Sequence, residues 1–155
     1  MSATVAPTSP SVSTQRHHAR PLIRLAKANE GPVVEWLLLE SGRHGTVDGI
    51  DWTQSIAPYW LIAEDEDGVA VGCLQVNPGK PLGRLDWMGV PAYLPRRQKA
   101  LIVRDLLLTG IATCRAQGSQ IVAGMIDDTL TDYQRLLVRR GGQAWSKGTM
   151  YVVRA

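Results

Sequence analysis

The segment that decides the fold is GRLDWMGVPAYLPRRQKALIVRDLLLTGIATCRAQGSQIVAGM, residues 83–125. It begins with a β-prone stretch, passes through a loop, and continues from Pro95 to about Ala116 with the apolar period of a long helix. Gly118 stands where a helix C-terminal cap belongs, and residues 120–125 form a short apolar strand. A strand, a helix and a strand in this order predict a parallel strand pair with a right-handed crossover.

The predicted long helix carries one wide apolar stripe. We expect this stripe to face the core, and we expect Arg104 and Asp105 to point outward. The stripe consists of Leu101, Leu107, Ile111 and Cys114, broadened by Val103, Leu106 and Leu108.

The residues before this segment predict a strand, a helix and an antiparallel meander. Leu22–Ala26 is β-prone, and a helix begins at Asn29 or Glu30 with Pro32 in its first turn and stops at Gly42. The meander has strands at residues 60–63, 69–76 and 83–90, with turns at 65–68 and 78–81.

The residues after it predict a second amphipathic helix and a closing hairpin. The helix spans Leu130–Arg140 and ends at Gly141-Gly142, and the hairpin pairs residues 143–145 with 149–153. The order is therefore β-α-βββ-α-β-α-ββ. It predicts an α+β fold, with a mixed, mostly antiparallel twisted sheet and helices on both faces. Trp36, Trp60 and Trp145 are expected in the core.

The composition indicates one folded domain behind an N-terminal arm. The chain has 155 residues, of which 45% are hydrophobic and 20% charged, and we assign the domain to residues 21–155. Residues 1–20 are rich in Ser, Thr and Pro and end in a small basic cluster formed by Arg16, His17, His18 and Arg20. Either this arm is a flexible tail, or it docks on a partner subunit or an anionic surface.

Several classes of function are disfavoured. The net charge of +3 is unclustered, which argues against a nucleic-acid partner, and no apolar run is long enough to cross a membrane. Cys73 and Cys114 have no metal-ligand spacing, so we expect free thiols, no metal and a cytoplasmic protein. A catalytic thiol would need a nearby histidine, but His17, His18 and His44 all lie outside the periodic segments.

The start of the long helix has the features of an anion site. Its first backbone N–H groups have no intrahelical acceptor, and Arg96, Arg97 and Lys99 crowd the first turn. Cations there oppose the helix dipole, so a bound polyanion such as a pyrophosphate would account for them. A merely solvated basic turn is the other interpretation.

The element order from Pro21 to Ala155 resembles the GNAT (GCN5-related N-acetyltransferase) family. Residues 60–76, WLIAEDEDGVAVGCLQV, are similar to the second and third strands of that family, and Val90, Arg97 and the helix that follows are similar to its acyl-CoA loop. The resemblance implies acetyl-CoA, or another acyl-CoA, as co-substrate. It places the pantetheine beside Met88, Gly89 and Val90. It places the phosphates beside Arg97, Gln98, Lys99, Ala100 and Leu101, with Arg96 adjacent.

The chain departs from the family pattern at several positions. The segment from Val90 to Arg97 is two residues longer than usual, and Asp127-Asp128 stands near the position of the family's Asn. Gln98 and Ala100 stand where the loop has glycines, and Leu137 stands where the last helix has a tyrosine acid. Tyr133, one turn earlier, could replace that acid or simply pack the helix, and Asp86 could be the base or bond a nearby loop.

Two functions therefore stay open. The first is an N-acetyltransferase-like protein that transfers an acyl group from acyl-CoA to an amine, with Trp52 and Trp87 lining an acceptor pocket or a protein interface. The second is a degenerate GNAT-like fold that serves as a structural or interaction module in a larger assembly, such as a virus particle or a toxin–antitoxin-type complex. The amine acceptor and a homo-oligomeric state are left undecided.

Overall fold

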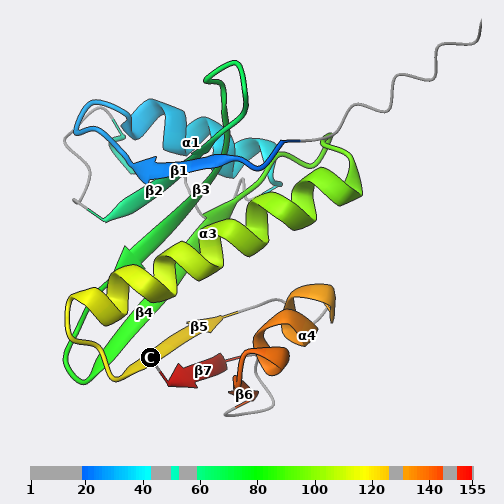
Figure 1. Ribbon diagram of the computed structural model, residues 1–155. Helices are drawn as coiled ribbons and strands as arrows, with labels where there is room; N and C mark the ends of the chain where they lie inside the picture. The colour runs from blue at the N-terminus through cyan, green and yellow to red at the C-terminus, as the bar shows by residue number, and fades with distance from the viewer. Residues whose placement is uncertain (1–18, 43–49, 53–58, 126–130, 145–149, 155) are drawn as a thin grey trace, which may run out of the picture.

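The computed structural model describes residues 19–42, 50–52, 59–125, 131–144 and 150–154 (Figure 1). The strands of the sheet lie in the order β1-β2-β3-β4-β5-β7-β6. Only β4 and β5 run parallel among the described pairs. The predicted α+β class and element order are confirmed. In chain order the elements are β1 (Leu22–Leu25), α1 (Gly31–Glu40), β2 (Trp60–Glu64), β3 (Ala70–Asn77), β4 (Leu82–Gly89), α3 (Arg96–Ala116), β5 (Ile121–Met125), α4 (Thr131–Arg139), β6 (Gln143–Ala144) and β7 (Met150–Arg154).

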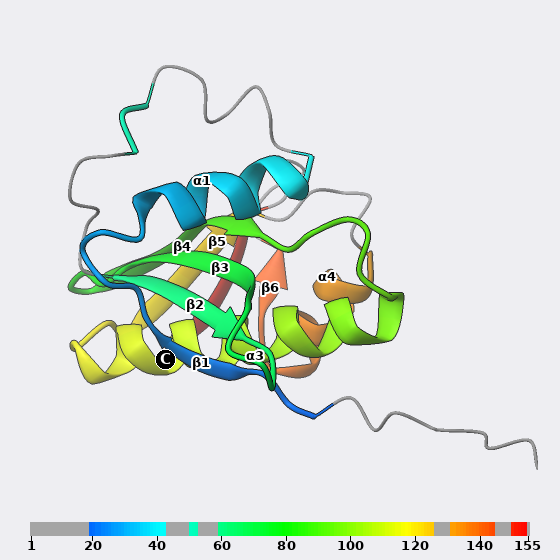
Figure 2. The ribbon, with the colours of Figure 1, turned by 90° about the horizontal axis from the view of Figure 1, so that it is seen from above.

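Helices cover both faces of the sheet, as predicted. Figure 2 shows α1 on one face and α3 on the other, and α4 lies on the α3 side, in contact with α3. Each face therefore has its own apolar cluster. The α3 face buries Leu61, Leu74, Val76, Ile102, Leu106 and Leu107 among others, and the α1 face buries Val34, Leu37, Leu38, Trp52, Trp60, Ile62 and Cys73.

Two glycines let α3 approach the sheet closely. A Cβ on Gly72 of β3 would lie 2.7 Å from Cγ2 of Ile102. A Cβ on Gly110 of α3 would lie 2.9 Å from Cδ2 atoms of Leu74 and Leu85. Interiors pack at crystal-like density, so side chains at these two positions would push the helix off the sheet.

The helix faces the sheet with a stripe that differs from the predicted one. Ile102 and Asp105 are buried, whereas Leu101 is only half-buried. The outward assignment of Asp105 is wrong because Arg20 and Arg104 compensate its charge, at 3.2 Å and 2.9 Å. Burial raises the pKa of the Asp105 carboxyl, but the hydrogen bonds from the two guanidinium groups outweigh it and lower the pKa overall.

The tryptophans divide between core and surface. Trp60 is buried as predicted, but Trp36 is 39% exposed on the outer side of α1, so its core assignment is wrong. In α1 the buried residues Val34, Leu37 and Leu38 already fill the face toward the sheet, which leaves Trp36 outside. Trp145 lies outside the described residues, as do His44, residues 1–18 and Asp127-Asp128.

A charged cluster ties β1, β2 and α1 together. Arg24 binds Glu64 at 2.6 Å and Glu30 at 2.7 Å, and all three side chains are largely buried. The hydrogen bond from Arg24 is the main cause that lowers the pKa of Glu30 to about 2. Glu30 therefore keeps its charge down to acidic pH.

The described residues hold no helix long and apolar enough to span a membrane. Cys73 and Cys114 are buried free thiols, as predicted. Within the same ranges, no three His, Cys, Asp or Glu side chains come together in a way that could hold a metal ion.

Candidate functional site

The candidate site begins where β4 separates from β5. The two strands pair from Leu82↔Ile121 to Leu85↔Gly124, and no described residue of β5 pairs with the rest of β4. On its other side β4 stays paired with β3 as far as Gly89. Among the described residues, the pairing of β4 with β5 therefore ends after Leu85, and we call the region along the unpaired edge of β4 beyond it the gap between β4 and β5. In this pairing Val122 lies opposite Gly83.

A β-bulge accompanies this separation. The pairing of β3 with β4 shifts between Leu74↔Met88 and Val76↔Leu85, so β4 has one extra residue at Asp86-Trp87. A bulge bends its strand and increases its twist, and bulges are common beside active sites. The bulge lies directly after Leu85, the last residue of β4 that pairs with a described residue of β5.

The backbone of β4 beyond the bulge faces the gap. Val76 N donates to Tyr59 O at 2.8 Å, so the backbone N–H and C=O groups of Val76 and of every second residue of β3 point toward β2. The backbone groups of the residues between them, Cys73 included, point toward β4. Gly89, opposite Cys73, therefore points its backbone groups at β3, and Met88 points its own into the gap. The pantetheine-binding role of Met88, Gly89 and Val90 stays a prediction. Gly89 also packs closely against α1, since a Cβ there would lie 2.8 Å from the carbonyl oxygen of Leu37.

The N-terminus of α3 follows at the end of the next loop. Pro95 is the N-cap residue and provides no side-chain hydrogen bond. The first helical bond runs from Lys99 N to Pro95 O at 3.0 Å, so the amides of Arg96, Arg97 and Gln98 have no intrahelical acceptor. The amides of Ala100 and Leu101 lie within the helix. The amides left without an intrahelical acceptor are therefore those of residues 96–98, and the anion site itself stays a prediction.

The three cations of this turn differ in their partners. Arg96 binds Asp132 at the start of α4 at 2.6 Å, and Lys99 donates to the carbonyl oxygen of Ala92 at 3.2 Å. Arg97 is exposed and has no partner among the described residues. It is therefore the cation of the turn that is available to a ligand.

Asp86 lies at the bulge, on the α1 side of the sheet. Its Oδ2 accepts a hydrogen bond from Asn77 Nδ2 at 2.5 Å and lies 3.4 Å from Arg84 Nη2. Within the described part of the chain its Oδ1 has no partner, and 29% of the side chain is exposed. The carboxylate is thus fixed at one oxygen and open at the other.

Tyr133 lies on the opposite side, in α4. It is half-buried against the α3-face cluster, and burial, followed by the charge of Asp132, raises the pKa of its phenol. The phenol therefore stays protonated at neutral pH. Leu137, one turn later, is buried in the core. Asp86 and Tyr133 are consequently not brought together but lie on the two faces of the sheet.

The α1 side near the gap is aromatic. Trp52 is buried and lies 6.0 Å from Trp60 and 6.2 Å from Trp87, between ring centroids. The rings are tilted or edge-on, as in favourable aromatic pairs. Trp52 therefore packs beneath α1 with the other two rings.

Sequence reasoning missed the bulge, Asn77 and the packing role of Gly89. The bulge depends on the pairing of two strands, which local composition does not reveal. Asn77 ends a strand before a Pro-Gly turn and has the character of an ordinary turn residue, so no signal pointed to its bond with Asp86.

The fold has well-defined counterparts among solved structures. The chain is similar to a GNAT-family acetyltransferase from Staphylococcus aureus Mu50, with a TM-score of 0.66 and 14% identity over 86% of this chain and 98% of that one. It is also similar to YncA from Salmonella typhimurium, a putative acetyltransferase solved with acetyl-CoA, with a TM-score of 0.62 and 16% identity over 88% and 94% of the two chains. A third is YhbS from Escherichia coli, a GNAT-family N-acetyltransferase in complex with CoA, with a TM-score of 0.58 and 19% identity over 96% and 85%.

No protein-family model and no curated protein matches the sequence. Many of the structural neighbours are GNAT acetyltransferases, and the likeness covers most of both chains in each comparison. The chain therefore has the GNAT fold, and the expected resemblance is confirmed at the level of the fold.

Proposed function

We propose that this protein binds an acyl-CoA in the gap between β4 and β5 and transfers its acyl group to an amine. The observation that carries the proposal is that the edge of β4 at Met88, unpaired with β5, is followed after a short loop by the uncapped start of α3 at residues 96–98. The neighbours YncA and YhbS, solved with acetyl-CoA and CoA, support this choice of ligand.

The edge of β4 and the start of α3 suit the two parts of an acyl-CoA, its amide-containing arm and its pyrophosphate. The Met88 backbone can hydrogen-bond an amide-containing arm as an added strand would. The free amides at residues 96–98, together with Arg97, can hold a pyrophosphate at the positive end of the helix dipole. Gln98 and Ala100, which stand where the family has glycines, lie in an ordinary helical turn. The free amides of residues 96–98 would therefore hold the pyrophosphate without those glycines.

The two candidate catalytic residues, Asp86 and Tyr133, would act on different reactants, the amine and the leaving thiolate. When bound, an acyl-CoA would supply the thioester from which the acyl group is transferred. Asp86, with Oδ1 open on the α1 side, would take the proton from the attacking amine, directly or through a water. Tyr133, protonated on the α3 side, would donate a proton to the leaving sulfur. This separation matches an acceptor and a cofactor that enter from different faces.

A calorimetric titration of the full chain with acetyl-CoA tests the cofactor. We expect saturable binding, and we expect Arg97→Glu to weaken it at least about tenfold because it replaces a phosphate-binding cation by a carboxylate. Arg115→Glu, which alters an exposed arginine in the last turn of α3, is the matched control. Absence of binding by the wild type at high micromolar ligand would overturn the proposal, and equal losses in the two variants would reduce it to general charge attraction.

Turnover is tested separately with a panel of primary amines and detection of the released thiol. Asp86→Asn should lower the rate and leave the calorimetric affinity for acetyl-CoA unchanged. If acetyl-CoA binds but no amine is acylated, the catalytic half of the proposal fails while the binding half stands.

A further inference from the structure

We propose that two copies of this chain associate through β1, with the two strands antiparallel about a two-fold axis at Ile23. β1 is the end strand of the sheet, and no described strand pairs with its outer side. The joined edge would continue the sheet from one copy into the next. This inference is independent of the proposed function.

The backbone of β1 has hydrogen-bonding groups directed outward. Ala26 N donates to Trp60 O at 2.7 Å, and positions that bond to a neighbouring strand alternate. Leu22 and Arg24 therefore face β2, whereas Ile23 and Leu25 point their N–H and C=O groups away from the sheet. Such an edge is a template for another strand.

The register centred on Ile23 satisfies these groups. It sets Ile23 opposite the partner's Ile23, which gives two hydrogen bonds, and each Leu25 N–H opposite the carbonyl oxygen of the partner's Pro21. Pro21 has no N–H to donate in return. The carbonyl oxygen of Leu25 that would face it already accepts a hydrogen bond from Nη1 of Arg24, at 3.1 Å. Donors and acceptors along the joined edge therefore match.

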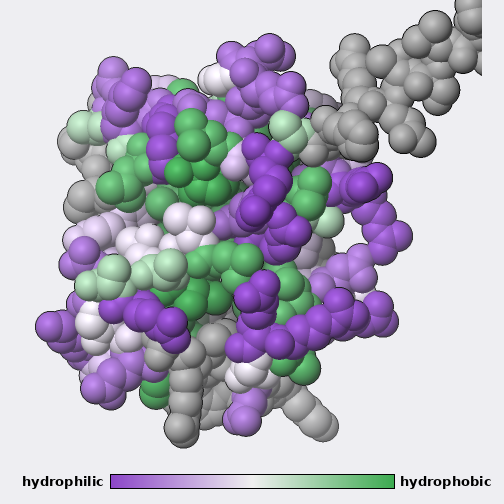
Figure 3. Space-filling model, in the orientation of Figure 1, coloured by the Kyte–Doolittle hydropathy of each residue, from purple (hydrophilic) through white to green (hydrophobic). Residues whose placement is uncertain are grey.

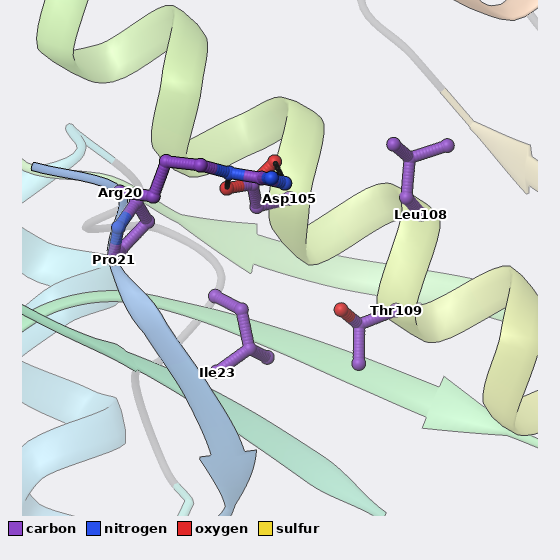
Figure 4. A pocket seen from close by; sticks show the side chains of 6 residues that line it. All are labelled: Arg20, Pro21, Ile23, Asp105, Leu108 and Thr109. Atoms are coloured by element: carbon purple, nitrogen blue, oxygen red, sulfur yellow. Dashed lines mark hydrogen bonds and ion pairs between the residues drawn. The ribbon is translucent and has the colours of Figure 1, made fainter.

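Side chains on the α3 side are complementary in the same register. An open hollow of about 440 Å³ lies between β1 and α3, lined by Arg20, Pro21, Ile23, Asp105, Leu108 and Thr109 (Figure 4). Leu25 shares the face of Ile23, since strand side chains alternate, and it is 52% exposed. Opposite Pro21 of the partner, Leu25 reaches that copy's hollow, so each copy offers both a projecting leucine and the space for it.

The rest of the edge agrees with this placement. Leu22, which is 63% exposed, would lie opposite the partner's Arg24 and be covered by its aliphatic stem. Lys27 would lie opposite Ala19 of the partner, whose N–H donates to Glu66 Oε1 at 3.3 Å. The exposed ammonium of Lys27 in one copy thus meets the exposed carboxylate of Glu66 in the other. Figure 3 shows hydrophobic surface on this face over β1 and α3, interrupted by charged side chains.

A register centred one residue later is less favourable. It would set the two Arg24 side chains opposite each other, and like charges across a strand pair are destabilising. It would also require the Leu25 carbonyl oxygen, already bonded to Arg24, to accept the partner's Ile23 N–H.

Sedimentation velocity of the full chain over a roughly hundredfold concentration range tests the proposal, because a dimer of this kind follows mass action. The wild type should move from monomer to dimer as its concentration rises. Leu25→Asp should raise the dissociation constant at least about tenfold, because it replaces the apolar side chain that fills the partner's hollow by a carboxylate. Leu25→Pro should act similarly by removing an outward N–H that no ladder bond of the monomer uses. Val138→Asp, an equally exposed apolar position on α4, is the control and should associate like the wild type.

A charge exchange tests the register. Lys27→Glu alone and Glu66→Lys alone should weaken association, and the double variant should restore it. A wild type that stays monomeric throughout, or Leu25 variants that dimerise as well as the wild type while circular dichroism shows them folded, would overturn the proposal. Loss of association in Val138→Asp would assign the contact to a different face.

Discussion

The two ends of α3 are built in opposite ways. At the C-terminal end the N–H of Gln117 bonds the carbonyl oxygens of Thr113 and Cys114, and Gly118 follows with a φ of +90°. Buried Ser119 then bonds Cys114 O through its N–H, and its Oγ accepts from Gly79 N. At the N-terminal end Pro95 supplies no side-chain cap, and the first turn contains no acidic residue.

Under the proposed function, this difference separates stability from function along a single helix. The C-terminal end satisfies its carbonyl groups and places Arg115 where the dipole favours a cation. The N-terminal end leaves its amides open and surrounds them with cations, against both rules. Local violations of this kind are expected at functional sites, and this one lies beside the gap between β4 and β5.

The C-terminal end of α3 should tolerate a larger side chain beside it less well than the N-terminal end. A Cβ on Gly83 would lie 2.7 Å from Ser119 Oγ and 2.8 Å from Cys114 Sγ. We expect Gly83→Val to lower the free energy of unfolding by about 3 kcal/mol, because it overpacks the junction of β4 with the end of α3. Urea denaturation measures this. Leu82→Val, at a 41% exposed position of the same strand, is the control, and an equal loss there would refute the assignment.

The ion pairs extend the comparison from the helix ends to the rest of the molecule. Glu30, which is largely buried, has its pKa lowered to about 2 by Arg24, so its contribution is fully present above the unfolded pKa near 4.5 and is lost as the pH falls toward 2. We expect Glu30→Gln to cost about 2 kcal/mol at neutral pH, and the difference from the wild type to shrink steadily below pH 4.5.

The exposed pair at the open end of α3 is the control for this pH dependence. Arg96 and Asp132 are 87% and 54% exposed, so solvent screens their attraction. Asp132→Asn should leave the stability near the wild-type value at every pH. A loss of stability comparable to that of Glu30→Gln would show that the N-terminal end of α3 is held as rigidly as the region around Arg24 and Glu30.

The C-terminal cap predicts a smaller effect. Gly118 has the left-handed backbone that disfavours a side chain, and a Cβ there would also meet the side chain of Lys80. We expect Gly118→Ala to cost about 1 kcal/mol. Gly141, with a φ of +83° and nothing within 4 Å of its added Cβ, isolates the backbone contribution, so Gly141→Ala should cost no more. Thermal denaturation of the two variants compares them.

The sequence was sufficient for the order and limits of the helices and strands, but not for the burial of two side chains on the helices. Helix limits, turns and the parallel pair follow from local signals such as Pro95, Gly118 and apolar periodicity. Asp105 was misplaced because its partner Arg20 lies 85 residues away in the chain. Trp36 was misplaced because its neighbours in α1 already fill the inner face.

The candidate site depends on relations between strands. The start of α3 could be found from its cations, and Met88 and Val90 from the resemblance. The bulge at Asp86-Trp87 and the bond from Asn77 arise only when β3 and β4 pair, so composition could not reveal them. Asp86 and Tyr133 could be named from the sequence, but their places on opposite faces of the sheet could not.

The open end makes the smallest prediction about stability, and that prediction has the opposite sign to the others. Arg97 is exposed in the first turn of α3, where a cation opposes the helix dipole. Arg97→Glu should therefore raise the free energy of unfolding by about 0.5 kcal/mol while it weakens binding of acetyl-CoA at least about tenfold. Urea denaturation and calorimetry of the same preparation measure both quantities. A stabilised variant with weakened binding would establish that the start of α3 gives up stability for its ligand. A destabilised variant would show instead that Arg97 contributes to the fold, and the contrast between the two ends of the helix would be lost.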